Sequence, residues 1–264
     1  MTIILSATTV WSQPTEISSL SSISDMAGHY RLTANVSGAS HTTITGPFTG
    51  TLEAAIDPNT KMPYKITGLK QPLFATVTGG TVKNLLFDGV AISGHSGNTG
   101  AICGEASGAS RIYNVGILSG SVGGTGNTGG LVGLLSGTAR VINCYSFATI
   151  TGGSNVGGIV GNNNATTTAA SINTMVMNCM FYGDITGGTT VSPVYGGTNI
   201  ANLQGGLNTF NYYAYDELKT KAISNNKYNS ALAVEEKFLN RHEFYRLPLN
   251  SNKKLAAFKH YIEL

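Results

Sequence analysis

Residues 127–161 read NTGGLVGLLSGTARVINCYSFATITGGSNVGGIVG, and this stretch decides the fold because it begins and ends on the same motif. The motif is Gly-Gly-Leu-Val-Gly at 129–133, and it returns as Gly-Gly-Ile-Val-Gly at 157–161. An earlier copy at 100–104 reads Gly-Ala-Ile-Cys-Gly, and a degenerate copy at 192–196 reads Ser-Pro-Val-Tyr-Gly. The apolar centres of the four copies therefore step along the chain by 29, 28 and 35 residues.

Asparagine is a second marker, and its copies at Asn84, Asn114, Asn143 and Asn178 step by 30, 29 and 35 residues. Because two independent markers share one period, the sequence contains an internal repeat of about 29 residues. The longer last step coincides with the polar stretch NNNATTTAA at 162–170, which we expect to bulge out as a loop.

Each repeat has the alternating pattern of β-strands. After Asn143, the even positions from 144 to 150 face one way and the odd positions face the other. Helical repeats are disfavoured, because each glycine in a helix interior would cost about 1 kcal/mol. A repeat of this length, with two or three strands, matches one coil of a stacked β-structure. We therefore predict an all-β chain built as a right-handed parallel β-solenoid (β-helix) of about 29-residue coils, with a small helical C-terminal segment.

Stacking would place equivalent residues of adjacent coils about 4.8 Å apart. The four repeated asparagines are then predicted to form a structural ladder, in which each side-chain amide donates to the next carbonyl. Cys144 and Cys179 occupy equivalent inward positions, and their expected Cβ separation exceeds the roughly 3.8 Å of a disulfide. We therefore predict free, buried thiols, with Cys103 on a different strand.

The repeats resemble the GLUG motif family, both in residues 127–161 and in PFTGTLEAAIDPNTKMPYKITGLKQPLFATVTGGTVKNLLF at residues 47–87. That motif has a Gly-Gly-Leu-Val-Gly core and an Asn-Cys-Tyr-Ser strand, and the resemblance covers about residues 45–197. This chain departs from it at Ala101 and at residues 192–193. The resemblance implies a bacterial surface or secreted protein, because members of the family belong to adhesins, large surface-anchored proteins and the non-catalytic parts of secreted proteases.

Composition divides the chain into parts. All 34 glycines lie between Gly28 and Gly206, whereas residues 211–264 carry 15 of the 29 charged residues. The predicted parts are a signal-peptide remnant at 1–13, an N-terminal cap at 14–45, the GLUG-type β-solenoid at 46–206 and a charged, partly helical C-terminal segment at 207–264.

Helices are expected only at the two ends of the chain. Residues 18–26 are predicted to form a short helix that covers the open edge of the first coil. Residues 231–258 have the apolar spacing of an amphipathic helix broken at Pro248, and a second short helix is expected at 252–261. The apolar run at 3–10 is too short to cross a bilayer, so no membrane span is predicted in the mature chain.

No group of residues has the spacing of a catalytic, cofactor or metal site. Enzymes that cut polysaccharides with two carboxylates need them close together, but Asp88 and Asp184 are three coils apart and Glu105 has no acidic equivalent. The five histidines match no ligand spacing, and the glycine-rich stretch 123–130 lacks the Lys-Ser/Thr ending of a phosphate loop. Basic residues near the C-terminus alternate with acidic ones, which argues against nucleic acid as a partner. We therefore predict that the chain is not an enzyme and binds no cofactor.

Arg111 and Arg140 are the best candidates for a ligand-binding face. Both lie three residues before a ladder asparagine, so stacking would bring their like charges together. Such a pair is either exposed and screened by salt or a contact for an acidic glycan. Tyr145 and Phe147 are predicted to add outward aromatic surface for sugars or proteins, unless they pack under a loop or the C-terminal helix.

These observations support functions of different classes. The first is a non-catalytic module, secreted or on the bacterial cell surface, for adhesion, for binding an extracellular glycan or a host or surface protein, or for structural spacing. The alternative is an accessory domain of a larger secreted protease or glycan-degrading enzyme, whose catalytic residues lie outside this chain. A third and weaker hypothesis is a solenoid enzyme that itself degrades glycans.

Overall fold

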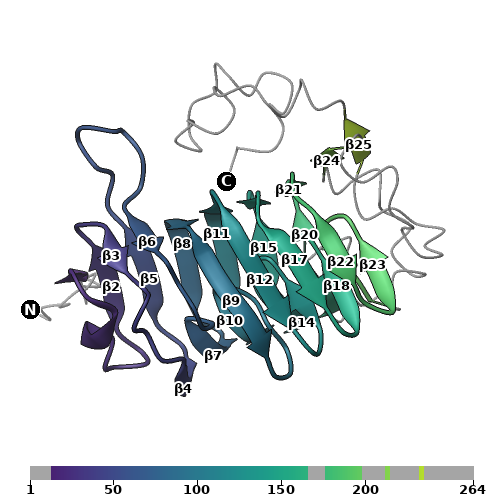
Figure 1. The fold of residues 1–264 in the computed structure, drawn as a ribbon. Coiled ribbons are helices and arrows are strands. Elements are labelled where there is room, and N and C mark those ends of the chain that lie inside the picture. The colour runs from purple at the N-terminus through teal and green to yellow at the C-terminus, as the bar shows by residue number, and fades with distance from the viewer. Residues whose placement is uncertain (1–12, 166–175, 198–211, 215–231, 235–264) are drawn as a thin grey trace, which may run out of the picture.

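The computed structural model describes residues 13–165, 176–197, 212–214 and 232–234 (Figure 1). In these parts of the chain the secondary structure is almost entirely β, with one short 3-10 helix, η1 (Leu20–Ser22). The strands of the four sheets pair in parallel, so the expected all-β class is confirmed. The predicted signal-peptide remnant lies outside the described residues except for Gln13.

The largest sheet contains 13 of the described strands and runs the length of the stack. Its main path is β1-β2-β5-β8-β11-β16-β21-β24-β25, and β3, β6, β15 and β20 pair beside that path. The bounds are β1 Thr15–Ile17, β2 His29–Leu32, β3 Val36–Ser37, β5 Thr51–Ala54, β6 Lys65–Thr67, β8 Thr81–Asp88, β11 Arg111–Ile117, β15 Arg140–Ile142, β16 Tyr145–Ser146, β20 Val176–Met177, β21 Met180–Phe181, β24 Tyr212–Ala214 and β25 Leu232–Val234.

Three smaller sheets accompany it. A 5-stranded sheet consists of β4 Ile44–Phe48, β7 Phe74–Thr78, β10 Cys103–Ser107, β14 Val132–Gly137 and β19 Val160–Ala165. A 4-stranded sheet consists of β9 Val90–His95, β12 Gly120–Gly124, β17 Thr149–Gly152 and β22 Ile185–Gly187. A 3-stranded sheet consists of β13 Thr128–Gly129, β18 Asn155–Gly157 and β23 Thr190–Ser192.

Each turn of the chain adds strands to these sheets, and we call the set of strands from one turn a rung. The motif residues fall into the register that the sequence predicts, since Cys103 pairs with Val132 and Val132 pairs with Val160. Figure 1 shows the successive rungs side by side along the molecule. The repeat length is therefore the length of chain that returns to the same sheet one strand further along.

The repeated asparagines bend each rung in the largest sheet. Asn84, Asn114, Asn143 and Asn178 have φ values of 49°, 59°, 55° and 51°, in the left-handed region that asparagine tolerates better than most residues. Nδ2 of Asn114 donates to Oδ1 of Asn84 at 3.0 Å, and Nδ2 of Asn143 donates to Oδ1 of Asn114 at 3.3 Å. Nδ2 of Asn178 donates in the same way to Asn143. Each asparagine thus turns its own rung, and its side chain links that rung to a neighbour.

A second asparagine ladder, which the sequence analysis did not identify, lies near the 3-stranded sheet. Nδ2 of Asn127 donates to Oδ1 of Asn98 at 2.8 Å, and Nδ2 of Asn155 donates to Oδ1 of Asn127 at 2.7 Å. The signal was available, because these three asparagines step by 29 and 28 residues. Every amide in both ladders donates toward the N-terminal rung.

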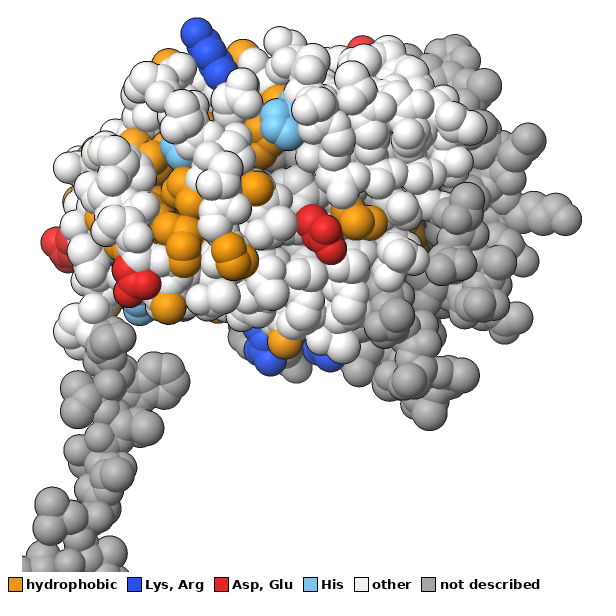
Figure 2. Space-filling view, turned by 90° about the horizontal axis from the view of Figure 1, so that it is seen from below, with side chains coloured by type: hydrophobic (Ala, Val, Ile, Leu, Met, Phe, Trp, Pro, Cys, Tyr) orange, Lys and Arg blue, Asp and Glu red, His pale blue; other side chains and the backbone are white. Residues whose placement is uncertain are grey.

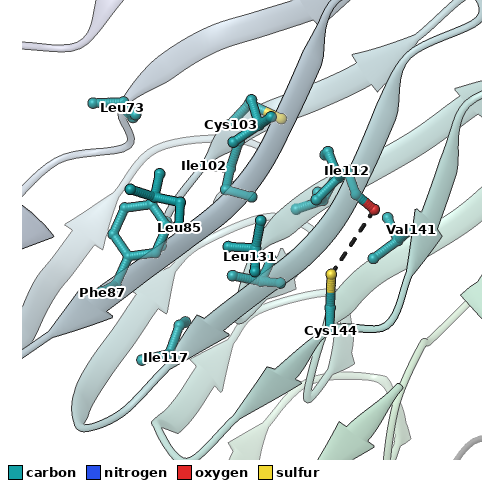
Figure 3. Close-up of a cluster of buried hydrophobic side chains, with 14 of the residues drawn as sticks. Leu73, Leu85, Phe87, Ile102, Cys103, Ile112, Ile117, Leu131, Val141 and Cys144 are labelled. Carbon is teal, nitrogen blue, oxygen red and sulfur yellow. Dashed lines mark hydrogen bonds between the residues drawn. The ribbon is translucent and has the colours of Figure 1, made fainter. Parts of the chain in front are cut away.

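Buried side chains from all four sheets form one hydrophobic cluster along the stack. Its members include Ile102 and Leu131, the apolar centres of two motif copies, which Figure 3 shows in the same cluster. Phe48 and Phe74, from neighbouring rungs, stack with ring centroids 4.3 Å apart. This continuous core couples each rung to the next, because neither face of a rung is completed by its own residues.

All three cysteines are buried and free. Sγ of Cys144 lies 3.2 Å from the carbonyl oxygen of Ile142 and 3.8 Å from that of Ile112, the contact drawn in Figure 3. Sγ of Cys179 lies 3.3 Å from the carbonyl oxygen of Met177, at the equivalent place one rung on. Burial raises the pKa of the Cys103 and Cys179 thiols.

The helix expected at residues 18–26 is wrong, because only η1 forms there and Ile17 belongs to β1. The apolar side chains of Ile17, Leu20 and Ile23 are buried, so a spacing that suited a helix instead closes the end of the core. The backbone amide of Asp25 donates to the Tyr30 hydroxyl at 2.8 Å and holds the segment in this turn.

The loop expected at residues 162–170 is wrong for its first four residues, because Val160–Ala165 forms β19. Asn162 pairs with Leu134 and Asn163 with Leu135, so the preceding rung supplies the hydrogen bonds that override the local turn preference. The rest of the stretch, from 166 to 170, lies outside the described residues.

The C-terminal helix expected at residues 231–258 is wrong at its start. Leu232–Val234 instead forms β25, which pairs in parallel with β24. An unpaired sheet edge offers backbone donors and acceptors to any nearby extended segment, and β21 offers such an edge to β24. The remainder of this helix and the one expected at 252–261 lie outside the described residues.

Substitutions of Asn143 should separate its two roles. Asn143→Gly keeps a residue suited to positive φ and removes only the amide, whereas Asn143→Ala also forces a Cβ into the left-handed region. We expect Asn143→Ala to lower the free energy of unfolding by roughly 1–3 kcal/mol and Asn143→Gly to lower it by less. Urea denaturation measures both, with the exposed loop variant Asn59→Ala as the control. Equal stability of all three variants would contradict the ladder's role.

The thiols should be unreactive until the protein unfolds. Because all three cysteines are buried, alkylation at pH 8 should label none in the native protein and three in denaturant. Mass spectrometry counts the labels. A single label in denaturant would mean that two of the cysteines form a disulfide.

Candidate functional site

Arg111 begins β11 and Arg140 begins β15, and the two residues are register partners in adjacent parallel strands. The residues that follow them, Ile112 and Val141, are fully buried in the core. Alternation along the strands therefore places both arginines on the outer face of the largest sheet. Arg111 is exposed and Arg140 is half-buried.

Two parallel rows of outward residues cross the sheet at this place. The first row contains, in register order, Arg31, Glu53, Lys83 and Tyr113. The second row, two residues away along each strand, contains His29, Thr51, Thr81, Arg111 and Arg140. We call the cations Arg31, Lys83, Arg111 and Arg140 the basic strip.

Glu53 lies in the middle of the first row and is only 6% exposed. Its Oε1 accepts hydrogen bonds from Nε and Nη2 of Arg31 at 2.9 and 2.8 Å, and lies 3.1 Å from Nε2 of His29. Its Oε2 lies 3.1 Å from Nζ of Lys83. Side chains from β2 and β8, the strands on either side of β5, therefore hold this carboxylate in place.

The charges of this cluster affect one another's ionisation. Partial burial alone would raise the pKa of Glu53, but the hydrogen bonds from Arg31, Lys83 and His29 outweigh it and hold that pKa below its ordinary value. Burial alone would lower the pKa of Lys83, but its contact with Glu53 outweighs it and raises that pKa. Both groups are consequently charged at neutral pH.

The basic strip carries more positive charge than Glu53 can balance. Arg31 and Lys83 share the single carboxylate, and within the described ranges neither Arg111 nor Arg140 has an acidic side chain within ion-pair distance. Arg111 and Arg140 are neighbours in the second row, and because adjacent strands lie about 4.8 Å apart, their like charges repel each other. An anionic group bound between them would relieve that repulsion.

The aromatic residues lie beyond the Asn143 bend, away from the arginines. The ring of Tyr145 lies over Gly116 of the preceding rung, where an added Cβ would clash with the ring. Phe147 meets Tyr145 edge to face at 5.7 Å between centroids and meets Tyr182 at 5.6 Å. Burial raises the pKa of Tyr145. Tyr145 and Phe147 are thus packed against neighbouring groups and are only partly available to a ligand.

The sequence analysis identified the arginine pair but missed Arg31, Glu53 and Lys83. These three residues are spaced by 22 and 30, and the shorter step belongs to the incomplete first rungs. No motif copy or ladder asparagine precedes Asn84, so the period could not be extended to the N-terminal strands. Only the register of β2, β5 and β8 brings the three side chains together.

The described part of the chain lacks two other kinds of site. There, no three His, Cys, Asp or Glu residues lie close enough to hold a metal ion, and no helix is long and apolar enough to cross a membrane. Figure 2 shows the face seen from below, on the side of β4, β7, β10 and β14, where most side chains are uncharged and charged ones are scattered.

Comparison with known proteins relates two segments of the chain to bacterial sequences. The family described as the M26 IgA1-specific metallo-endopeptidase N-terminal region matches residues 19–119. The GLUG motif matches residues 124–151, so the predicted resemblance to that family is confirmed.

One relative is the immunoglobulin A1 protease of Streptococcus sanguinis, which is 43% identical over 83 residues. The matched segment is 30% of this chain but only 4% of that protease. No solved structure matches the chain.

Removing the charge of Glu53 should make stability depend differently on pH. The pKa of Glu53 is lower in the folded state, so its stabilising effect is present above the ordinary glutamate pKa of 4.5 and is lost as the pH falls through the folded-state pKa. We expect Glu53→Gln to lower the free energy of unfolding by about 1–3 kcal/mol at pH 7, because three donors lose a charged acceptor. Urea denaturation from pH 7 to pH 3 should show this difference shrinking, and a difference independent of pH would contradict the assignment.

Proposed function

We propose that this chain is a non-catalytic accessory segment of a larger secreted protease. The observation that carries the proposal is the match of residues 19–119 to the N-terminal region of a metallo-endopeptidase family, a region named apart from any catalytic domain. The similarity to a small part of the Streptococcus sanguinis protease also supports an accessory role in a larger protease. Secretion or display on the bacterial surface is part of the proposal and rests on the same likeness.

We infer further that the stacked rungs form a right-handed parallel β-solenoid. The support is the parallel register, in which strands of successive rungs pair side by side within each sheet. Connections between parallel strands of one sheet are right-handed in about 98% of cases, which favours that hand. Such a structure is rigid along its length, because each rung contacts only its neighbours through a continuous core.

A rigid stack of this kind suits holding and spacing more than chemistry. Its outer faces present fixed rows of side chains, and the basic strip concentrates positive charge across two neighbouring rows. We propose that Arg111 and Arg140 contact an acidic glycan or an acidic surface of a protein partner. Their spacing is set by backbone pairing, so the two charges meet an extended polyanion without rearrangement. The packed rings of Tyr145 and Phe147 are less suited to this role.

The gene that encodes the chain tests the accessory role directly. We expect its reading frame to encode, beyond these residues, a His-Glu-x-x-His zinc motif of a metallo-endopeptidase. We also expect the purified chain to leave immunoglobulin A1 intact when both are incubated together. A frame without any catalytic motif would overturn the accessory role, and cleavage by the purified chain would overturn the non-catalytic one.

Binding through the basic strip should be weak and sensitive to salt. The Debye length is about 8 Å at physiological ionic strength, so added salt screens exposed arginines strongly. On an array of sulfated and uronic-acid glycans, we expect binding at low salt that falls at high salt. The double variant Arg111→Ala/Arg140→Ala should bind much less, while Lys61→Ala, which removes a cation elsewhere, should bind as the unchanged chain does. Equal binding by both variants would exclude this face.

A further inference from the structure

A cavity of about 230 Å³ opens among strands β7, β9 and β10 and the segment that follows β9. Its walls carry the polar side chains of Thr43, His95, Asn98 and Glu105, and its floor includes Pro72 and Ala75. Glu105 lies between Gly104 and the buried Ala106 of β10, and its side chain points away from the core. None of these residues belongs to the basic strip.

Several polar atoms in this cavity have unused hydrogen-bonding capacity. Oγ1 of Thr43 is buried and has no partner among the described residues. Asn98 begins the second ladder, so its Oδ1 accepts from Asn127 while its Nδ2 has no partner in the described part of the chain. A buried hydroxyl without a partner is unfavourable, so a hydrogen-bonding group that reached Oγ1 of Thr43 would stabilise it.

The two titratable residues are each held on one side only. Oε1 of Glu105 accepts a hydrogen bond from Oγ of Ser136 at 2.7 Å, which leaves Oε2 to accept from a ligand. Nδ1 of His95 lies 3.1 Å from Oγ1 of Thr99, which leaves Nε2 of that ring for a ligand. Burial lowers the pKa of His95, so the ring is neutral at pH 7 and the carboxylate is the only charge on the cavity wall.

This combination selects a particular kind of ligand. A lone carboxylate repels anions and accepts hydrogen bonds from hydroxyl groups. The cavity of about 230 Å³ has room for one small ring. The apolar floor suits the C–H face of such a ring, and the polar wall suits hydroxyls along its edge.

We propose that this cavity binds one neutral monosaccharide unit, with ligand hydroxyls donating to Glu105 and hydrogen-bonding to Thr43, Asn98 and His95. The site is separate from the basic strip and extends the proposed function from an acidic partner to a neutral sugar. We assign binding to this cavity and no catalysis. A neutral glycan could thus be held at one face of the stack while an acidic group is held at another.

The test is ligand-observed NMR on the 264-residue chain with glucose, galactose, mannose, fucose, N-acetylglucosamine and N-acetylgalactosamine. We expect saturable binding of at least one sugar with a dissociation constant on the order of millimolar, as a ligand of this size allows. Glucuronate should bind more weakly than glucose, because Glu105 repels its carboxylate.

Variants of the cavity should separate sugar binding from adventitious contact. Glu105→Gln should weaken binding roughly tenfold, because a charged acceptor is lost. Ala75→Leu should abolish binding by filling the floor, and circular dichroism confirms that each variant folds. If Ala75→Leu does not fold, Glu105→Gln alone decides.

The matched control is Arg111→Ala/Arg140→Ala, which should bind these sugars as the unchanged chain does. Loss of sugar binding in that control would assign it to the basic strip and overturn the cavity. The absence of saturable binding to every sugar in the panel would overturn the proposal. Unchanged binding by folded Glu105→Gln or Ala75→Leu, or tighter binding of glucuronate than of glucose, would do so as well.

Discussion

In four of the rungs the backbone bends at one position in the largest sheet, and an asparagine in the left-handed region makes that bend. The residue meets two demands at once, because it tolerates a positive φ and its amide can donate and accept along the stack. Glycine would meet the first demand without the second. In these rungs the strands before and after the bend pair in register with the same strands of the neighbouring rung.

The outward rows follow from that register. Arg111 and Arg140 face the same way because each lies three residues before its bend, and the core residues beside them leave no other orientation. Glu53 is held between β2 and β8 by the same parallel pairing. Each rung therefore contributes one side chain to an outward row. Backbone hydrogen bonding between strands fixes the distance from one such side chain to the next.

Much of this arrangement could be predicted from the sequence, wherever the period is regular. The equivalence of Cys103, Val132 and Val160 and the pairing of Arg111 with Arg140 follow from counting residues. The Glu53 cluster could not be found in this way, because the first rungs lack the motif. Residues 162–165 show another limit, since local composition favours a turn while pairing with β14 of the preceding rung makes these residues part of a strand. The C-terminal strands depend on a sheet edge that local apolar spacing does not reveal.

The two asparagine ladders share one direction, since every amide donates toward the N-terminal rung. Each interior asparagine therefore sees the same neighbours before and after it, whichever rung it occupies. A gene duplication that copies one whole repeat would insert a rung whose asparagines fit at once, and a deletion of one repeat would close the gap equally well. The length of such a protein can thus change in steps of one repeat during evolution, while the polar residues at the two ends of each ladder keep their places.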